Sequence, residues 1–108
     1  MSTSTPLGQF GRFAEPAMLI LVCLLDGPKH GYAIMTEAES LGGVPLGAGT
    51  LYAALARLEE GGLIEPVPSD DRRRPYRLTG LGATAVEAQL KAMEGFARLG
   101  LRRLRDAP

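Results

Sequence analysis

The feature that most constrains this chain is the order of elements in its central third. A segment with helical periodicity over residues 49–60 ends at Gly61-Gly62, and two short strand-like segments follow, over residues 63–67 and 75–79. The loop between those segments carries three consecutive arginines, Arg72 to Arg74. A helix followed by two short strands around a charged loop is typical of the winged helix-turn-helix, in which a helix enters the DNA major groove and a wing contacts the backbone or minor groove.

Composition fits a small, mainly helical domain. The 108 residues are 45% hydrophobic and 6% aromatic with no Trp, which predicts an aliphatic, helix-rich core. A chain of this length forms one domain, close to the size at which association with a second copy adds stability. We therefore expect a mainly α fold with a small β-hairpin (α+β), built as a winged helix-turn-helix with a long C-terminal dimerisation helix.

Charge is balanced overall but unevenly placed. With 12 basic and 12 acidic residues the formal net charge is zero, so total charge argues neither for nor against a nucleic-acid partner. The arginines gather in two places, at Arg72, Arg73, Arg74 and Arg77 and at Arg98, Arg102, Arg103 and Arg105. A neutral protein with a local basic patch can bind DNA with a small non-specific background.

The apolar run near the N-terminus predicts a buried helix rather than a membrane anchor. Residues 17–25 are fewer than the ~20 that a spanning helix needs, and Asp26-Gly27-Pro28 follow without a signal-peptide cleavage pattern. A single cysteine, Cys23, excludes an internal disulfide and fits a reducing compartment. We expect a cytoplasmic protein without a membrane partner.

The N-terminal quarter predicts an arm and a first helix. Residues 1–14 form a flexible arm, with three apolar side chains able to pack on a neighbouring subunit, Leu7, Phe10 and Phe13. The helix begins near Glu15-Pro16, because Pro is tolerated in a first turn, and ends at Asp26-Gly27-Pro28.

A second helix is expected from residue 31 or 32 to Leu41. Its predicted core-facing residues are Tyr32, Ala33, Ile34 and Leu41. Gly42-Gly43 breaks the helix, and a stub of edge strand is expected over residues 44–46.

The last helix predicts a dimer. It opens at Thr79 or Gly80, with Thr79 as N-cap, and continues to about Arg105. Apolar and small residues recur along it in alternating steps of four and three, at Val86, Leu90, Met93, Ala97, Gly100 and Leu104. Because so long a helix has nothing of its own to pack on, this seam predicts a partner helix, and residues 15–79 and 80–108 form the DNA-binding and dimerisation parts.

The third helix predicts a core face and a DNA face. Leu51, Leu55 and Leu58 with Ala54 fall on the core side. The opposite side carries small residues and a few polar ones, among which we expect DNA contacts from Thr50, Tyr52, Ala53 and Arg57. The alternative is an ordinary solvated helix, with Tyr52 half-buried in the core.

The wing loop predicts phosphate contacts. The planar guanidinium group of arginine can donate two hydrogen bonds to phosphate oxygens, and it fits a narrow minor groove. We expect such contacts from Arg72, Arg73, Arg74 and Arg77, although Asp70-Asp71 can neutralise part of this charge.

These segments together resemble the PadR family of bacterial transcriptional regulators. The resemblance covers about residues 15–82 and rests on motifs that occur in one order. They are Ile20 to Leu25 with Gly27-Pro28, His30-Gly31-Tyr32-Ala33-Ile34, Gly49-Thr50-Leu51-Tyr52, Leu55, Arg57-Leu58-Glu59, Gly62-Leu63-Ile64, and Arg72-Arg73-Arg74 with Tyr76-Arg77-Leu78-Thr79 and Gly82.

The resemblance implies a homodimeric winged helix-turn-helix, usually a repressor, whose long C-terminal helix builds the dimer. It places DNA contacts on Thr50, Tyr52, Arg57 and the wing arginines, and it implies release by a small molecule or stress signal in some members. Ala53 departs from the family pattern, because many members have Pro there, and this leaves the phosphate contacts of the helix entry open.

Metal and catalytic sites are not expected. His30 is the only histidine and is distant from Cys23, so these two residues do not form a metal centre. We interpret His30 as a turn residue between two helices and Cys23 as a small core residue, since a thiol in apolar surroundings is unreactive. With no nucleophile–base pair and no phosphate-cradling loop, we expect neither an enzyme nor a cofactor.

Two interpretations are open for the apolar residues between the first and last helices. They could bind a flat apolar effector, as some PadR-like dimers do, or form ordinary dimer core. The residues concerned are Met18, Val22, Leu90, Met93 and Phe96.

The sequence thus predicts a homodimeric transcriptional repressor that binds a pseudo-palindromic operator in double-stranded DNA. One alternative is a winged-helix module that docks a protein partner through its neutral, Ala-rich face. Another is a small-molecule sensor without DNA binding.

Overall fold

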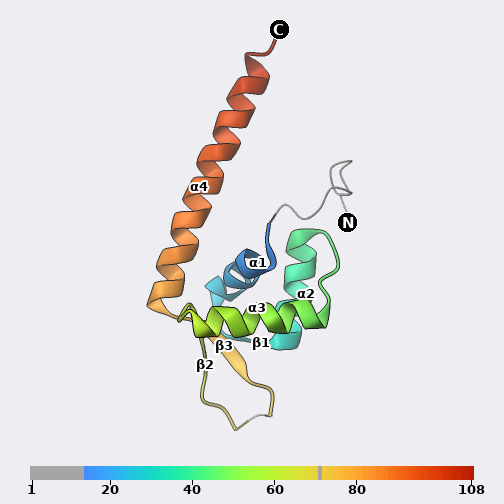
Figure 1. Ribbon diagram of the computed structural model, residues 1–108, viewed down its shortest axis with the longest axis vertical. Coiled ribbons are helices and arrows are strands. Elements are labelled where there is room, and N and C mark those ends of the chain that lie inside the picture. Colours follow the sequence, from blue (N-terminus) through green and yellow to red (C-terminus); the bar gives the residue numbers. More distant parts are fainter. Residues whose placement is uncertain (1–13, 71) are drawn as a thin grey trace.

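The computed structural model describes residues 14–70 and 72–108. Short helices pack over a small sheet, while a long helix extends from one end of this body and a hairpin loop projects from the other (Figure 1). The helices are α1 (Pro16–Cys23), the 3-10 turn η2 (Leu24–Asp26), α2 (Gly31–Gly42), α3 (Ala48–Glu60) and α4 (Gly80–Arg105). The strands are β1 (Lys29–His30), β2 (Ile64–Pro66) and β3 (Pro75–Leu78). The mainly α fold with a small antiparallel sheet, arranged as a winged helix-turn-helix, is confirmed.

The predicted arm lies outside the described residues, apart from its last residue. This holds for Leu7, Phe10 and Phe13 and for their expected packing on a neighbouring subunit. The first helix itself begins where the sequence predicts. Glu15 is extended at the N-cap and Pro16 occupies the first turn, where a missing amide costs no hydrogen bond. Gly27 ends the segment at φ +133°, a conformation that favours glycine.

The sheet has the order β1-β3-β2, with antiparallel pairing throughout. The expected edge-strand stub over residues 44–46 is wrong, and the third strand is β1 instead. Residues 45–47 form an irregular loop. That loop is held by the buried Leu46 side chain and by the Leu46 amide, which donates to Glu39 Oε1 at 3.0 Å. His30, interpreted as a turn residue, lies in β1 and is the N-cap of α2.

The core-facing side of α2 differs from the prediction. Of the four residues expected there, only Ile34 is buried, whereas Tyr32 is 66% exposed and Leu41 is 39% exposed. Ala33 is also exposed. The buried side is set by Ile34 and Ala38, one helical turn apart, with a glycine at each end of the helix. Tyr32 therefore points away from the core.

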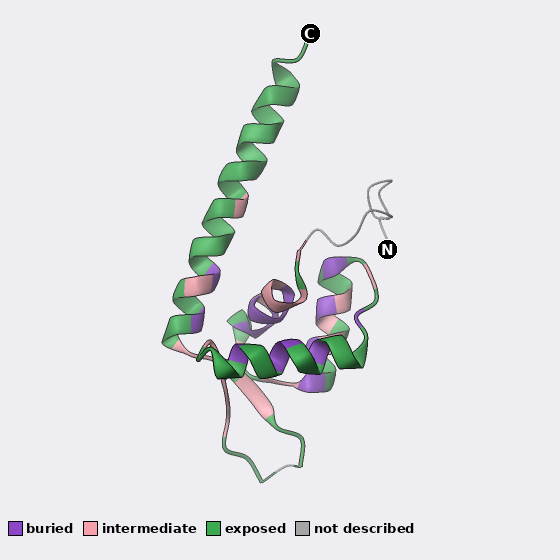
Figure 2. Ribbon diagram, in the orientation of Figure 1, coloured by how far each residue is buried: buried purple, intermediate pink, exposed green. Residues whose placement is uncertain are grey.

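The core lies where α1, α2, α3 and the first turns of α4 meet (Figure 2). The predicted inner face of α3 is confirmed, because Leu51, Ala54, Leu55 and Leu58 are all buried. Val86 is 1% exposed and belongs to this same core. Its surface is therefore covered within the chain, which corrects its expected place in the dimer seam, and the uncovered part of that seam begins at Leu90.

The start of α4 is clamped onto the segment that precedes β2. Thr79 caps the helix, because its Oγ1 accepts a hydrogen bond from the Gly82 amide at 3.0 Å and donates one to the Gly62 carbonyl at 2.6 Å. The Thr79 amide donates to the Leu63 carbonyl at 3.1 Å. A Cβ at Gly82 would lie 2.0 Å from that same carbonyl oxygen. Only glycine allows this approach without a backbone shift.

Gly82→Ala should therefore destabilise the fold, although Ala is the better helix former. Forcing the backbones apart should lower the free energy of unfolding by roughly 2–4 kcal/mol, measured by urea denaturation. Gly95→Ala in the same helix is the control, because its Cβ would meet no atom within 4 Å. That change should stabilise by up to about 1 kcal/mol. Equal effects of the two substitutions would contradict the close approach at Gly82.

Candidate nucleic-acid interface

The outer face of α3 is open along its whole length. Thr50, Ala53 and Arg57 are exposed, opposite the buried leucines. At the start of the helix Gly47 provides no side-chain cap, and the first intrahelical bond runs from the Leu51 amide to the Gly47 carbonyl at 2.9 Å. The amides of the first turn thus face outward, where they and the helix dipole favour an anion. This end of α3 has the chemistry of a phosphate contact.

Tyr52 is half-buried and half-exposed, with 53% of its surface accessible. One edge of its ring lies over the start of α2, because a Cβ at Gly31 would be 2.9 Å from the Tyr52 hydroxyl oxygen and 3.1 Å from Cε1. Because Gly31 has no side chain, the tyrosine ring fits between α2 and α3. The ring is packed on one edge, and its other edge remains accessible on the outer side of α3.

The wing projects beyond the body as an extended hairpin (Figure 1). The Val67 amide donates to the Pro75 carbonyl at 2.9 Å, which continues the pairing with β3 one residue past the end of β2. The three loop arginines, Arg72 to Arg74, are exposed. A shallow hollow on the wing is lined by Pro66, Val67, Pro68, Ser69 and Arg74. The loop therefore carries exposed arginine side chains, and the main-chain pairing of β2 and β3 holds its base.

Arg77 differs from the loop arginines. It lies in β3, and its Nε is 2.7 Å from Oε2 of Glu65 on the neighbouring strand. Both side chains are about half exposed, at 50% and 45%. Glu65 was not singled out from the sequence, because its partner is twelve residues away and faces it only once the hairpin has formed. A phosphate contact by Arg77 would compete with this ion pair.

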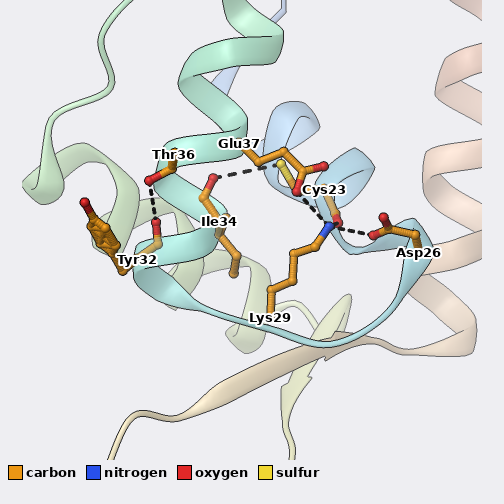
Figure 3. A network of polar contacts seen from close by, with 7 residues as sticks. All are labelled: Cys23, Asp26, Lys29, Tyr32, Ile34, Thr36 and Glu37. Atoms are coloured by element: carbon orange, nitrogen blue, oxygen red, sulfur yellow. Dashed lines mark hydrogen bonds and ion pairs between the residues drawn. The ribbon is translucent and has the colours of Figure 1, made fainter.

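Lys29, which no sequence pattern singles out, joins α1, η2 and α2 (Figure 3). Lys29 Nζ donates to the Cys23 carbonyl and to Asp26 Oδ1 at 2.5 Å, and it lies 2.8 Å from Glu37 Oε2. Burial disfavours its charge, but the hydrogen bonds with Asp26 and Glu37 outweigh this and raise the lysine pKa. The bond from Lys29 lowers the pKa of Asp26. This cluster fixes the turn that leads into the helix-turn-helix.

Cys23 lies in the core, as predicted. Its side chain is fully buried, and Sγ is 3.9 Å from the Ile34 carbonyl oxygen. Burial raises the thiol pKa to about 11, so the thiol is protonated at neutral pH. A protonated, buried thiol is a poor nucleophile.

Lys29→Met should destabilise the protein most at neutral pH. The substitution leaves the Cys23 carbonyl and Glu37 without their cation, at a cost of about 1–3 kcal/mol. Because the pKa of Asp26 is lowered in the fold, its contribution is present above its ordinary pKa and is lost as the pH falls through the folded value. The pKa of Lys29 is raised in the fold, so its contribution to the stability of the fold is present at neutral and low pH and is lost only in strong alkali. The penalty should therefore shrink below about pH 4.

Urea denaturation of the unmodified protein and of Lys29→Met, from about pH 3 to about pH 7, measures the loss of stability. Lys91→Met is the matched control, because Lys91 pairs with Glu87 at 3.5 Å on the solvent side of α4 and is 74% exposed. Its effect should stay within about 0.5 kcal/mol. A penalty for Lys29→Met that is small, or the same at pH 3 and pH 7, would contradict the role of this cluster.

The uncovered part of α4 is rich in exposed apolar side chains. Leu90 is 39% exposed, Phe96 is 79% exposed and Leu104 is 72% exposed. Met93 is partly buried, while Ala97 and Gly100 are exposed. Of the predicted effector residues, Met18 and Val22 on α1 pack partly against the core. Leu90, Met93 and Phe96 lie on α4, and Phe96 is exposed. A ligand between α1 and α4 would therefore be enclosed only if another surface covered Phe96.

The described ranges, 14–70 and 72–108, contain neither a group of metal ligands nor a membrane-spanning helix. No group of three or more His, Cys, Asp or Glu side chains in them is arranged to hold a metal ion. No helix in them has the length and apolar character needed to cross a membrane.

Comparison with known proteins places this geometry in a family. Residues 20–88 match the transcriptional regulator PadR-like family. Transcriptional regulator Rv3488 of Mycobacterium tuberculosis is 38% identical over 76 residues, which make up 68% of this chain and 70% of that protein. An uncharacterized 37.1 kDa protein in transposon TN4556 of Streptomyces fradiae is 44% identical over 82 residues, or 76% of this chain. The match covers 24% of that protein, so the chain spans about a quarter of its length.

A solved structure agrees with the match. The crystal structure of a PadR family transcription regulator from Clostridium difficile R20291 superposes with a TM-score of 0.76 at 25% identity, over 84% of this chain and 99% of that one. The matched residues include α2, α3, the wing and the clamped start of α4. The chain belongs to the PadR-like family of transcriptional regulators.

Proposed function

We propose that this chain is a sequence-specific DNA-binding regulator that acts as a homodimer. The observation that carries the proposal is the placement of the open face of α3 next to a projecting wing with exposed arginines. The wing extends from the side of the body where α3 lies, and α4 extends in the opposite direction (Figure 1). One end of the molecule is thus available for DNA and the other for a second subunit.

In the proposed complex α3 enters the major groove. Thr50 and Tyr52 contact the backbone near the outward-facing amides of the helix start, and the Ala53 methyl meets base edges. Arg57, one turn further on, contacts a phosphate or a base. Because this face has few hydrogen-bonding side chains, DNA shape carries much of the specificity.

The wing supplies electrostatic contacts. Arg72, Arg73 and Arg74 follow the phosphate backbone or enter the adjacent minor groove. Each phosphate that they neutralise releases counterions and makes binding more dependent on salt.

Dimerisation follows from the exposed side of α4. Its 26 residues make a rod about 39 Å long, of which only Gly82 and Val86 are buried. The stripe of Leu90, Met93, Ala97, Gly100 and Leu104 runs along one side of this rod. Covering the stripe with the same stripe of a second copy removes apolar surface from water in both subunits.

The dimer would bind a pseudo-palindromic operator in the cytoplasm. Two α3 helices related by a two-fold axis reach successive major grooves, with half-site centres about 34–36 Å apart. Repression is the proposed outcome, as the family resemblance implies, with release by an apolar effector bound near α1 and α4.

Fluorescence anisotropy with the DNA upstream of the chain's own gene tests the proposal. Binding to this duplex should be much tighter than binding to a random duplex of equal length and should weaken steeply with salt. Absence of binding to either duplex at low salt would contradict it and would favour a protein-interaction module or a small-molecule sensor.

A further inference from the structure

We propose that Glu65 limits the affinity of the wing for DNA, because it holds Arg77 in an ion pair and so keeps that guanidinium off the DNA backbone. Because the proposal concerns how the wing meets DNA, it rests on the proposed function. It changes the expected role of Arg77 from a phosphate contact to a paired group, and it assigns a role to an acidic residue within the cationic wing.

The backbone register brings the two residues together. Glu65 and Arg77 are direct partners across the antiparallel pair of β2 and β3. Side chains alternate along a strand, and the neighbours Ile64 and Leu78 pack into or against the core. Glu65 and Arg77 therefore share the opposite, outward face of the hairpin. Their Nε–Oε2 distance of 2.7 Å is that of a charge-assisted hydrogen bond.

The pair divides the wing into two electrostatic zones. At the stem, Arg77 and Glu65 cancel each other's charge. At the loop, the side chains of Arg72 to Arg74 are exposed. DNA docked on the wing thus meets its cations at the loop and a neutral pair at the stem.

Glu65 opposes the transfer of Arg77 to phosphate in two ways. The transfer breaks the hydrogen bond with Glu65, and it also leaves an unpaired carboxylate beside a row of negative phosphates. Like charges at such short range repel, and this penalty arises with any DNA sequence. Glu65 therefore limits the non-specific part of the affinity, which arises from backbone contacts. Because backbone contacts carry no sequence information, binding to the operator and to random DNA is lowered alike.

Glu65→Gln tests this directly, because Gln keeps the shape of Glu and removes its charge. We expect Arg77 to gain a phosphate contact in the variant. Affinity for a random duplex at low salt should rise about 3- to 10-fold, and the slope of log K against log salt should steepen by about 0.9 per wing. Affinity for the operator duplex should rise by a similar factor, because the gained contact carries no sequence information.

A double-mutant cycle separates release of Arg77 from mere loss of a negative charge. In the Arg77→Gln background, Glu65→Gln should leave the salt slope unchanged, because no guanidinium is there to be released. Circular dichroism and thermal unfolding check that all variants are folded, as expected for a pair on the surface.

Each outcome has a distinct meaning. An unchanged salt slope in Glu65→Gln, or an equal steepening with and without Arg77, would refute the role of Glu65 while leaving DNA binding intact. If the unmodified protein bound no duplex, the proposed function and this role would both be refuted.

Discussion

Leu90→Asp is expected to convert the protein to monomers and to weaken operator binding by at least about 100-fold. Leu90 is the first residue of the α4 seam that the chain's own core leaves uncovered. An aspartate in the seam of each copy would bury unpaired charge, which costs more than the leucines gain. A monomer engages one half-site alone and loses the affinity that linking two half-sites provides, typically 10²- to 10⁴-fold. Light scattering and anisotropy measure the two effects.

Leu99→Asp is the matched control for the seam. Leu99 lies on the same helix with 40% of its surface exposed, against 39% for Leu90. Nine residues separate the two, so they point to opposite sides of α4. Leu99→Asp should remain dimeric and bind the operator. A dimeric Leu90→Asp protein, or two variants that dissociate alike, would contradict a seam along the Leu90 side.

Replacing Arg72, Arg73 and Arg74 with Ala should weaken binding to every DNA sequence. Each lost phosphate contact should flatten the slope of log K against log salt by about 0.9, so two wings in a dimer give a large combined change. We expect at least about a tenfold loss at moderate salt, with operator and random duplexes affected alike, because backbone contacts carry no sequence information. Anisotropy titrations at several salt concentrations measure both quantities.

A second triple variant separates contact from general charge. Replacing Arg102, Arg103 and Arg105 with Ala removes the same charge from the far end of α4, where all three side chains are exposed. This variant should keep nearly the same salt slope, since distant charges are screened beyond about 10 Å at ordinary ionic strength. Equal losses in the two triple variants would show that the wing makes no direct phosphate contact.

Local chemistry made much of the fold predictable. Leu51, Leu55 and Leu58 recur at helical spacing, and all three are buried. Thr79 stands just before a helical segment and caps it through the Gly82 amide. In both cases the interacting residues are close in sequence, so the pattern alone contains the information.

Pairings between distant segments were not predictable in this way. The strand β1 has two residues and no periodicity, and it exists because β3 offers it an open edge. Tyr32 was expected in the core because it is aromatic, but the phase of α2 is set by Ile34 and Ala38. The Lys29 cluster likewise depends on Glu37, which approaches it only when α2 packs on the preceding turn.

The candidate interface was predictable in its residue types but not in its internal pairings. The sequence indicates an exposed arginine loop and an open α3 face, and the structure places both on the surface. The sequence does not indicate that Tyr52 packs on Gly31, or that Arg77 forms an ion pair with Glu65. These contacts depend on helix crossing and strand register, which are set by the packing of the whole domain.

Hydroxyl-radical footprinting on the DNA upstream of the gene, combined with the stoichiometry of the complex, tests the central claim most directly. Two subunits joined through α4 should protect two half-sites whose centres are about one helical turn apart, with two chains per duplex. Protection of a single half-site by one chain, or no protection at concentrations where the protein is dimeric, would contradict the paired arrangement of α3 helices and wings.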